Sequence, residues 1–437
     1  MEYYKNIRYL LYGNGVSNQA VKRFFDKHNY TYLEFTDNDT ITKIDDLLNR
    51  IDVVIKSPGI KPETILLEKA HSKEKQIIND IELFYRLFKP KHIIGVTGTN
   101  GKTTTAKLIA CLLNKAYSVH LCGNIGNPIF NETTADFEKD YFVIELSSFM
   151  LHDVSELQLE VGVITNITEH HLDWHKNLQD YKNTKLHMLD CIKQDKGIAI
   201  LGINVKLCNF IKIYQVIQKN NSLMIDDISI DCRSKEVLIN NKKVFTIRND
   251  ELSTNFELFD AIIACFVALK QGIPLIEINK GLNTFEKEHY RNELIYKNEN
   301  FSIINDAKST NPSCTLVLLN ACLQNKNKVI LIFGGKTNDD NYAQLLFLLK
   351  KKKNCFYKII GYGELSEKLE KNFRLLNLDF VKETTLKSAF KSLIKLLDDF
   401  KGIVIYSPAA QSYDQFSNYE ERGKLFTELV NKQFKTI

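Results

Sequence analysis

The stretch Thr97-Gly98-Thr99-Asn100-Gly101-Lys102-Thr103-Thr104-Thr105 decides the fold class of this chain. It follows an apolar run, His92–Val96, and precedes an amphipathic pattern that starts at Ala106. A strand, a glycine-rich turn and a helix in this order are typical of a phosphate-binding loop in an α/β domain. We therefore predict a nucleotide-binding domain built around this loop. The alternative is an ordinary glycine turn in front of a helix.

Each part of the loop suits a different contact with phosphate. Gly98 and Gly101 let the backbone approach phosphate oxygens, and the N-terminus of the next helix points its N–H groups at the anion. Lys102 can reach the terminal phosphates, and the Thr103 hydroxyl can bind Mg²⁺. Five residues separate Gly95 from Gly101, which is one more than in the general pattern.

Length and composition limit the class of protein. A chain of 437 residues with 44% hydrophobic residues is long enough for about three globular domains. The net charge of +5 is small, and the basic run Lys350–Lys353 fits a solvated helix end better than a nucleic-acid site. The apolar run Ala261–Leu269 is too short to cross a bilayer, and the N-terminus does not resemble a signal peptide. Nine scattered cysteines suggest reduced thiols. We expect a cytoplasmic monomer that binds no nucleic acid and does not insert into a membrane.

Apolar strand patterns alternate with helical patterns along most of the chain. This alternation predicts the α/β class, with mostly parallel sheets and helices on both faces. Three domains follow: a Rossmann-like N-terminal domain over 1–89, a central P-loop ATPase domain over 90–288, and a Rossmann-like C-terminal domain over 289–437. Within the central domain, 229–247 is predicted to be rich in strands and 258–271 to be a helix.

Polar side chains follow two apolar strands of the predicted central domain. Glu145 comes directly after the strand 141–144, where a carboxylate is placed to hold Mg²⁺ beside a bound phosphate. The stretch Asn166–Asp173 follows the strand that begins at Val161, and this second cluster suggests a second metal ion. An ordinary polar turn is the alternative for Asn166–Asp173. On spacing alone, Lys185 is interpreted as a surface lysine of a helix.

Polar clusters also follow the strands of the third segment. They are Asn305–Asn311, Gly334–Lys336 and Ser407–Phe416. One such cluster would be an ordinary polar loop, but three in one domain indicate a site. Their lysines and hydroxyls suit a small anionic substrate better than a hydride acceptor.

Together these stretches resemble the Mur ligases over essentially the whole chain. The resemblance is carried by Ser57–Ile60, Asp80–Phe84, Thr97–Thr104, Gly123–Gly126, Glu145–Phe149, Asn166–Asp173, Tyr181–Lys185, Asn305–Asn311 and Ser407–Gly423. The phosphate loop is shared with folate polyglutamate synthases, whereas Asp306–Asn311 and Ser412–Gly423 are similar to the family members that add D-glutamate. No Asp-Asn-Pro-Arg motif occurs, which argues against the diaminopimelate-adding members.

The resemblance implies an ATP-dependent ligase of peptidoglycan precursor synthesis. ATP would phosphorylate the carboxylate of UDP-N-acetylmuramoyl-L-alanine, and the amine of D-glutamate would attack the acyl phosphate to give the amide, ADP and phosphate. The resemblance also implies two Mg²⁺ ions and a carbamylated lysine at Lys185. Two other hypotheses stay open. One is another amino-acid ligase such as a folate polyglutamate synthase, and the other is a nucleotide-dependent binding or switch protein without ligase activity.

The resemblance assigns roles to single residues, all of them expectations. Catalytic roles are implied for Lys102, Glu145, His171 and Lys185, and metal ligation for Thr103, Glu145, His171 and Lys185. Contacts with ATP are expected at Gly98, Thr99, Asn100, Gly101, Lys102, Thr103, Thr104, Arg291 and Asp306. Contacts with the muramyl-alanine substrate and with D-glutamate are expected at Val16, Ser17, Ser57, Pro58, Gly59, Asn124, Ser147, Lys308, Thr310, Lys336, Ser412 and Tyr419.

Three features depart from the family pattern. Glu257 and Asp260 stand where two asparagines are usual, the second of them near adenine, so the sequence leaves the adenine contacts open. An extra residue, Tyr290, precedes Arg291. Position 419 is tyrosine where phenylalanine is common, which is a mild change.

Overall fold

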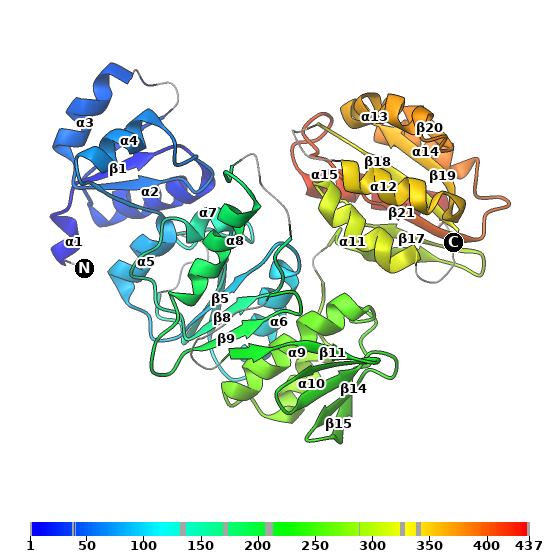
Figure 1. Ribbon diagram of the computed structural model, residues 1–437, viewed down its shortest axis with the longest axis horizontal. Helices are drawn as coiled ribbons and strands as arrows, with labels where there is room; N and C mark the ends of the chain where they lie inside the picture. Colours follow the sequence, from blue (N-terminus) through cyan, green and yellow to red (C-terminus); the bar gives the residue numbers. More distant parts are fainter. Residues whose placement is uncertain are drawn as a thin grey trace. The chain divides into compact units, whose positions relative to one another are not determined.

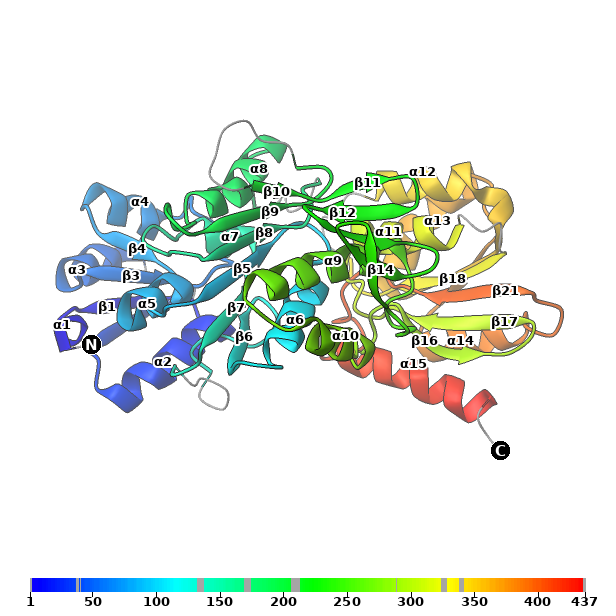
Figure 2. The ribbon, with the colours of Figure 1, turned by 90° about the horizontal axis from the view of Figure 1, so that it is seen from below.

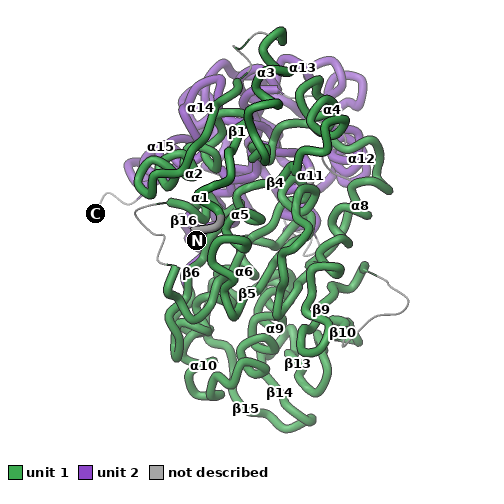
Figure 3. Tube along the Cα trace, turned by 90° about the vertical axis from the view of Figure 1, so that its left-hand side faces the viewer, with its two compact units in different colours: residues 1–285 green, residues 286–437 purple. Residues whose placement is uncertain are grey.

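The computed structural model describes residues 2–36, 39, 41–131, 137–168, 174–205, 213–287, 289–323, 328–337 and 342–434. The chain forms two compact units, Met1–Phe285 and Glu286–Ile437, which are coloured separately in Figure 3. The predicted α/β class with mostly parallel sheets is confirmed. The predicted domain boundaries after residues 89 and 288 stay predictions. Within the described part of the chain, no helix combines the length and apolar character needed to span a membrane.

The first unit begins with a four-stranded parallel sheet in the order β2-β1-β3-β4. Its strands are β1 (Tyr9–Tyr12), β2 (Tyr32–Phe35), β3 (Val53–Lys56) and β4 (Gln76–Ile78). The helices of this region are α1 (Glu2–Lys5), α2 (Val16–His28), α3 (Ile44–Arg50), α4 (Ile65–Ser72) and α5 (Asp80–Phe88) (Figure 1). Because β2 and β3 pair with opposite sides of β1, the strand order reverses between β1 and β3. Open parallel sheets bind ligands outside the carboxyl ends of their strands at such a point.

The turn after β1, Gly13-Asn14-Gly15-Val16-Ser17-Asn18, resembles the glycine-rich turn of dinucleotide-binding domains, but Asn18 stands in the place of the third glycine. Its side chain is buried, and Nδ2 donates to the carbonyl oxygens of Tyr12 (2.9 Å), Gly13 (3.0 Å) and Ile55 (3.1 Å). A glycine at this position would serve close packing of helix and strand. Here an amide joins the first turn of α2 to the ends of β1 and β3, so the departure from the glycine pattern keeps the loop in place.

A six-stranded parallel sheet follows, in the order β10-β9-β8-β5-β7-β6. Its strands are β5 (Ile93–Thr97), β6 (Val119–Gly123), β7 (Tyr141–Glu145), β8 (Val161–Ile164), β9 (Ile198–Leu201) and β10 (Ile213–Gln215). Its helices are α6 (Lys102–Leu113), α7 (Ser148–Leu151) and α8 (Leu178–Leu186). The central strand β5 is buried along its whole length and pairs with β7 on one side and β8 on the other. The segments that leave β5, β7 and β8 therefore meet at one edge of the sheet.

A five-stranded antiparallel sheet completes the first unit. Its strands are β11 (Ile217–Lys219), β12 (Ser222–Ile225), β13 (Ile228–Asp231), β14 (Glu236–Ile239) and β15 (Lys242–Thr246). The predicted strand-rich stretch 229–247 is confirmed, but the sheet begins earlier in the chain, at β11. This first strand is exposed and carries little apolar signal, so the sequence did not indicate it. Helix α9 (Asn255–Lys270) packs against β12 and β13, and α10 (Leu275–Asn283) follows it (Figure 2). A capping box of Thr254 and Glu257 starts α9 ahead of the predicted residue.

Phenylalanine side chains join the two parallel sheets of the first unit into one hydrophobic core. The ring centroids of Phe24 in α2 and Phe130 lie 4.8 Å apart. Those of Phe84 in α5 and Phe142 in β7 also lie 4.8 Å apart. Such aromatic pairs add to the stabilisation from buried area. This shared core explains why both sheets belong to one compact unit.

The second unit contains one six-stranded sheet in the order β16-β17-β21-β18-β19-β20. Its strands are β16 (Glu293–Lys297), β17 (Phe301–Asn305), β18 (Val329–Gly334), β19 (Phe356–Tyr362), β20 (Phe380–Glu383) and β21 (Gly402–Tyr406). Its helices are α11 (Pro312–Cys322), α12 (Ala343–Lys351), α13 (Gly363–Leu375), α14 (Leu386–Ile394) and α15 (Tyr419–Phe434). β16 pairs antiparallel with β17, and the other pairings are parallel. The last strand, β21, inserts between β17 and β18, so the loops after these three strands are neighbours.

Asp80, the first residue of α5, is a buried carboxylate in the first unit. Burial raises its pKa from the ordinary 3.8 to about 6, and the Ser17 hydroxyl and the N–H groups of Asp80 and Ile81 only partly oppose this rise. The native state therefore holds this proton to higher pH than the unfolded chain does. Folding stability contributed by the neutral carboxyl is present at low pH and is lost as pH rises from about 4 to about 6.

We expect Asp80→Asn to stabilise the first unit more at neutral than at acidic pH. The amide has nearly the same shape but does not ionise. From the pKa shift, the gain in the free energy of unfolding should be roughly 2 kcal/mol larger at about pH 7.5 than at about pH 4.5. Urea unfolding of the wild type and the variant at both pH values measures this difference. An equal effect at the two pH values would contradict the prediction.

Candidate active site

The phosphate loop joins β5 to α6 at the centre of the six-stranded sheet of the first unit (Figure 1). Its two glycines adopt backbone angles that other residues disfavour, with φ of +143° at Gly98 and +84° at Gly101. A Cβ on Gly98 would lie 2.0 Å from Thr165 Oγ1. Gly101 is the N-cap of α6 and has no side chain to occupy the helix N-terminus. The N-terminus of α6 therefore presents N–H groups that can bind an anion.

The segment after β8 holds the phosphate loop by hydrogen bonds. Thr99 N donates to Asn166 O at 2.9 Å, and Asn100 N donates to Asn166 Oδ1 at 3.0 Å. The Asn100 carbonyl oxygen in turn accepts from Asn166 Nδ2 at 2.9 Å and from Thr165 Oγ1 at 2.6 Å. These bonds hold the loop in shape before any ligand binds, which lowers the entropy lost on binding.

Thr103 and Glu145, predicted from separate motifs, are in contact. Thr103 Oγ1 donates to Glu145 Oε2 at 2.8 Å, and Asn124 Nδ2 donates to Glu145 Oε1 at 3.1 Å. A hydroxyl and a carboxylate beside a phosphate site are the oxygen donors that Mg²⁺ accepts together with phosphate and water. The residues present therefore fit Mg²⁺. Among the residues that the structure describes, no three His, Cys, Asp or Glu side chains gather as a metal site. His171, the expected second ligand, lies outside the described residues.

Lys185 is buried, so its interpretation as a surface lysine is wrong. The face of α8 that carries Tyr181, Thr184 and Lys185 turns inward. Lys185 Nζ donates to Thr97 Oγ1 at 3.3 Å and lies 4.9 Å from the centre of the Tyr181 ring. Burial, and next the charge of Lys102, lower the pKa of Lys185 well below its ordinary value, against a smaller opposing effect of Glu145. A neutral amine is thus favoured at this position.

The remaining loop residues have mixed surroundings. Lys102 Nζ donates to the carbonyl oxygen of Thr99 at 2.9 Å, so the lysine folds back over the loop. Thr104 lies in the first turn of α6 and is partly exposed. The hydroxyl of Thr105 donates to Asp260 Oδ1 at 2.7 Å. Asp260 is therefore hydrogen-bonded to α6, the helix that follows the loop.

The residues predicted to bind the UDP-sugar lie at the carboxyl edge of the first sheet. Gly15 N donates to Ser57 Oγ at 3.3 Å, which brings the turn after β1 against the loop after β3. Val16 is exposed and Ser17 is buried at the start of α2, while Pro58 and Gly59 form the tip of the second loop. Ser147, by contrast, caps α7, because its Oγ accepts from Met150 N at 3.2 Å.

Asp306 is the centre of a polar cluster in the second unit. It is buried, and its carboxylate accepts from Asn292 N at 3.1 Å and from Ser407 Oγ at 2.7 Å. Burial raises its pKa, which the Ser309 and Ser407 hydroxyls and the Arg291 charge partly oppose. The charge of Arg291 thus acts on the Asp306 carboxylate, and the shared nucleotide role of the two residues stays a prediction.

The predicted D-glutamate residues lie on the neighbouring loops of the second unit. Lys308 Nζ is 5.3 Å from the ring centre of Tyr419, and Lys336 N donates to Gln411 O at 2.8 Å beside the buried Ser412. Thr310 is partly exposed in the loop that starts at Asp306. These loops follow β17, β18 and β21, so the polar groups gather at one edge of the sheet.

Two residues without a predicted role shape these sites. His175 is buried, with Nε2 2.9 Å from Ser148 Oγ and Nδ1 3.1 Å from Asp180 Oδ2. Arg422 is fully buried, and its Nη2 donates to the carbonyl oxygens of Ala307 and Ala410, both at 2.9 Å. Arg422 belongs to the motif stretch Ser407–Gly423. Nothing in the residue spacing predicts that its guanidinium bonds to two different loops.

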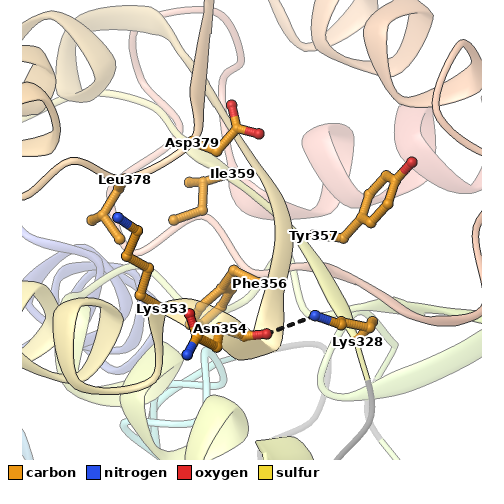
Figure 4. Close-up of a pocket in the computed structure, with 8 residues that line it drawn as sticks. All are labelled: Lys328, Lys353, Asn354, Phe356, Tyr357, Ile359, Leu378 and Asp379. Carbon is orange, nitrogen blue, oxygen red and sulfur yellow. Dashed lines mark hydrogen bonds between the residues drawn. The ribbon is translucent and has the colours of Figure 1, made fainter.

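A separate pocket of about 320 Å³ lies in the second unit, beside the amino ends of β18 and β19 (Figure 4). The polar loops lie at the carboxyl ends of these strands, at the other edge of the sheet. On the rim of the pocket, Lys328 Nζ donates to the carbonyl oxygen of Asn354 at 2.8 Å. The predicted site residues do not line this pocket. It is therefore not part of the candidate active site.

Comparison with known proteins identifies the family. Residues 96–259 match the family model described as the Mur ligase middle domain. A UDP-N-acetylmuramoylalanine–D-glutamate ligase of Hydrogenobaculum sp. is 32% identical over 431 residues, which cover 98% of this chain and 100% of the relative. The chain belongs to the Mur ligase family. The resemblance predicted from the motifs is confirmed.

A second relative and a solved structure are similar to this chain over nearly their whole length. A ligase of the same name from Caldicellulosiruptor bescii is 30% identical over 465 residues, covering 99% of this chain and 98% of that protein. The structure of MurF ligase from Thermotoga maritima in complex with ADP superposes with a TM-score of 0.58 at 15% identity, over 98% of this chain and 97% of that one. At so low an identity the structural likeness shows the shared Mur ligase fold alone.

We expect Gly98→Ala to weaken nucleotide binding at least ~10-fold, because the new Cβ would displace Thr165 and open the bonds that hold the loop. Gly272→Ala is the matched control, since it also has a positive φ (+80°) but its Cβ would meet open space. Gly272→Ala should lose about 1 kcal/mol of stability from its backbone angle alone, and Gly98→Ala should lose more because Thr165 must also move. Titration with an ATP analogue measures affinity. Equal nucleotide affinity in the two variants would disprove the loop assignment.

Proposed function

We propose that this Mur ligase joins D-glutamate to UDP-N-acetylmuramoyl-L-alanine with ATP, through an acyl phosphate, in cytoplasmic peptidoglycan precursor synthesis. The observation that carries the proposal is the contact of Thr103 with Glu145 beside the phosphate loop, with the buried Lys185 close by. The substrate pair is supported by the shared name of two relatives, D-glutamate ligases that are 30% and 32% identical to this protein over nearly the whole chain.

Phosphoryl transfer needs charge stabilisation at the phosphate loop. ATP would contact the loop from Gly98 to Thr104, where the N-terminal N–H groups of α6 favour anions. Lys102 would stabilise negative charge on the transferred group, since a fixed cation acts most strongly where charge develops. Thr103 and Glu145 would hold Mg²⁺, which reduces the repulsion between ATP and the substrate carboxylate.

Lys185 would act as a carbamate. An amine buried beside the loop is costly to charge, and the neutral form is the one that reacts with CO₂. The carbamate carries two anionic oxygens, which suit a second Mg²⁺. His171 would be a further ligand of that ion. The amine itself could not ligate Mg²⁺ well, because this ion prefers oxygen.

The two substrates would bind through different parts of the chain. The region 1–89 would bind the uridine diphosphate through Val16, Ser17, Ser57, Pro58 and Gly59, and the region 90–288 would position the muramyl-alanine end through Asn124 and Ser147. The region 289–437 would bind D-glutamate. Its contacts would be Lys308, Thr310, Lys336, Ser412 and Tyr419, and Arg291 and Asp306 would contact the nucleotide.

The decisive test is which substrates release phosphate from ATP. With Mg²⁺ present, release should require both UDP-N-acetylmuramoyl-L-alanine and D-glutamate, because phosphate leaves only when the amine attacks the acyl phosphate. L-Glutamate is the control amino acid. Release that needs a folate and L-glutamate would favour a folate polyglutamate synthase. Release without either substrate would favour a nucleotide-dependent switch.

A second test concerns Lys185. We expect the peptide that contains it to carry the added mass of one CO₂ together with the transferred alkyl group when the carbamate of the native protein is trapped by alkylation. Lys185→Ala should lose at least ~10²-fold in turnover, and formate or acetate should restore part of it by supplying the missing oxygen ligand. Lys182→Ala, on the exposed face of the same helix, is the matched control and should stay near wild type. Absence of both the added mass and the rescue would disprove the carbamate.

A further inference from the structure

Lys56, the last residue of β3, is a buried cation that the reaction scheme does not use. Its side chain has 0% exposure, and Nζ lies 2.8 Å from Asp153 Oδ2, whose side chain is 6% exposed. Asp153 comes from the segment after α7, so the pair joins the four-stranded sheet to the neighbouring six-stranded one within the first unit. Burying such a pair requires further hydrogen bonds to offset its loss of hydration.

On the acidic side of the pair, Asp153 Oδ1 lies 2.7 Å from His152 Nδ1. On the basic side, the hydrogen bonds of Lys56 come from one loop, Ser57–Ile60. Lys56 Nζ donates to the carbonyl oxygens of Ile60 at 2.8 Å and Pro58 at 3.4 Å. The carbonyl between them, that of Gly59, accepts from Trp174 Nε1 at 3.2 Å. Three carbonyl oxygens of the loop are thus held by donors on its inner side.

The same arrangement leaves the outer side of the loop available. Gly59 is exposed, and within the described residues its N–H makes no hydrogen bond. A Cβ on Gly59 would meet no atom within 4 Å, so the space over the tip is open. Ser57 Oγ, which accepts from Gly15 N at 3.3 Å, joins this side to the turn after β1.

Trp174 is itself held by Lys56 and by aromatic side chains. Lys56 Nζ lies 5.4 Å from the centre of the Trp174 ring, within the range of a cation–π contact. Phe149 and His175 pack on the same ring, with centroids 4.8 Å and 4.6 Å away. The donor to Gly59 is therefore fixed by Lys56 and by the aromatic side chains of the six-stranded sheet region, and not by the loop itself.

We propose that Lys56 is a positioning residue for the UDP-sugar. Together with Trp174 it turns the carbonyl groups of Ser57–Ile60 inward, so that the Gly59 N–H faces the ligand. Without Lys56 the carbonyl oxygens would rotate toward solvent and repel an anionic diphosphate. This inference rests on the proposed function, because it takes the UDP-sugar as the ligand of this loop.

Kinetics of paired variants test this role. Lys56→Met should raise KM for UDP-N-acetylmuramoyl-L-alanine at least ~10-fold, the scale of lost hydrogen bonds from a charged group, with KM for ATP changed less than ~2-fold. Lys56→Met/Asp153→Leu removes both buried charges, so it should recover the urea midpoint of the wild type while KM stays high. Trp174→Phe keeps a ring but loses the donor, and should raise the same KM several-fold. Lys61→Met, an exposed lysine of the same loop, is the matched control.

The outcomes separate a positioning role from a structural one. If the double variant recovers both the urea midpoint and KM, the pair serves the fold alone and the inference is wrong. Unchanged KM in Trp174→Phe would also overturn it, even if Lys56→Met does not fold. Direct titration of the wild type with the UDP-sugar tests the premise that this protein binds that ligand. A wild type that binds none of it would overturn the proposed function, and this inference with it.

Discussion

The hydrogen bonds between the phosphate loop and the segment after β8 are the constraint on which the site depends. The side chain of Asn166 accepts from the Asn100 N–H and donates to the Asn100 carbonyl oxygen. Thr165 Oγ1 donates to the same carbonyl oxygen. Only glycine at position 98 leaves room for this approach. Because the loop is held on this side, the start of α6 faces Glu145 at the end of β7. A loose loop would lose this adjacency of the phosphate and metal groups.

The two parallel sheets of the first unit and the mostly parallel sheet of the second unit place polar groups by one geometric rule. In each of them the strand order reverses, and the loops beside the reversal carry the polar clusters. In the second unit the last strand, β21, inserts between β17 and β18. Asp306 and Ser407 leave neighbouring strands and are hydrogen-bonded, although they are distant in the sequence. The edge of a sheet thus gathers residues that no local motif connects.

Buried charges mark the places where these loops are held. Lys56 is paired with Asp153, Arg422 bonds to two loop carbonyl groups, and Asp306 accepts from three loop segments. Such groups lose hydration on burial and add little net stability. Their effect is to allow one loop conformation, since any other would leave a charge without partners. Burial also lowers the pKa of Lys185 and so favours its neutral form.

The sequence by itself determined the fold class, the family and the order of strand β5, glycine turn and helix α6, because these depend on local spacing and on motifs that stay close along the chain. The positive backbone angles of Gly98 and Gly101 are typical of such a turn. The tertiary structure alone decided that Lys185 is buried, that Asn18 replaces a glycine by bonding three carbonyl groups, and that Lys56 holds the Ser57–Ile60 loop. Burial and long-range hydrogen bonds arise only when strands distant in the sequence pair, and residue spacing carries no signal of them.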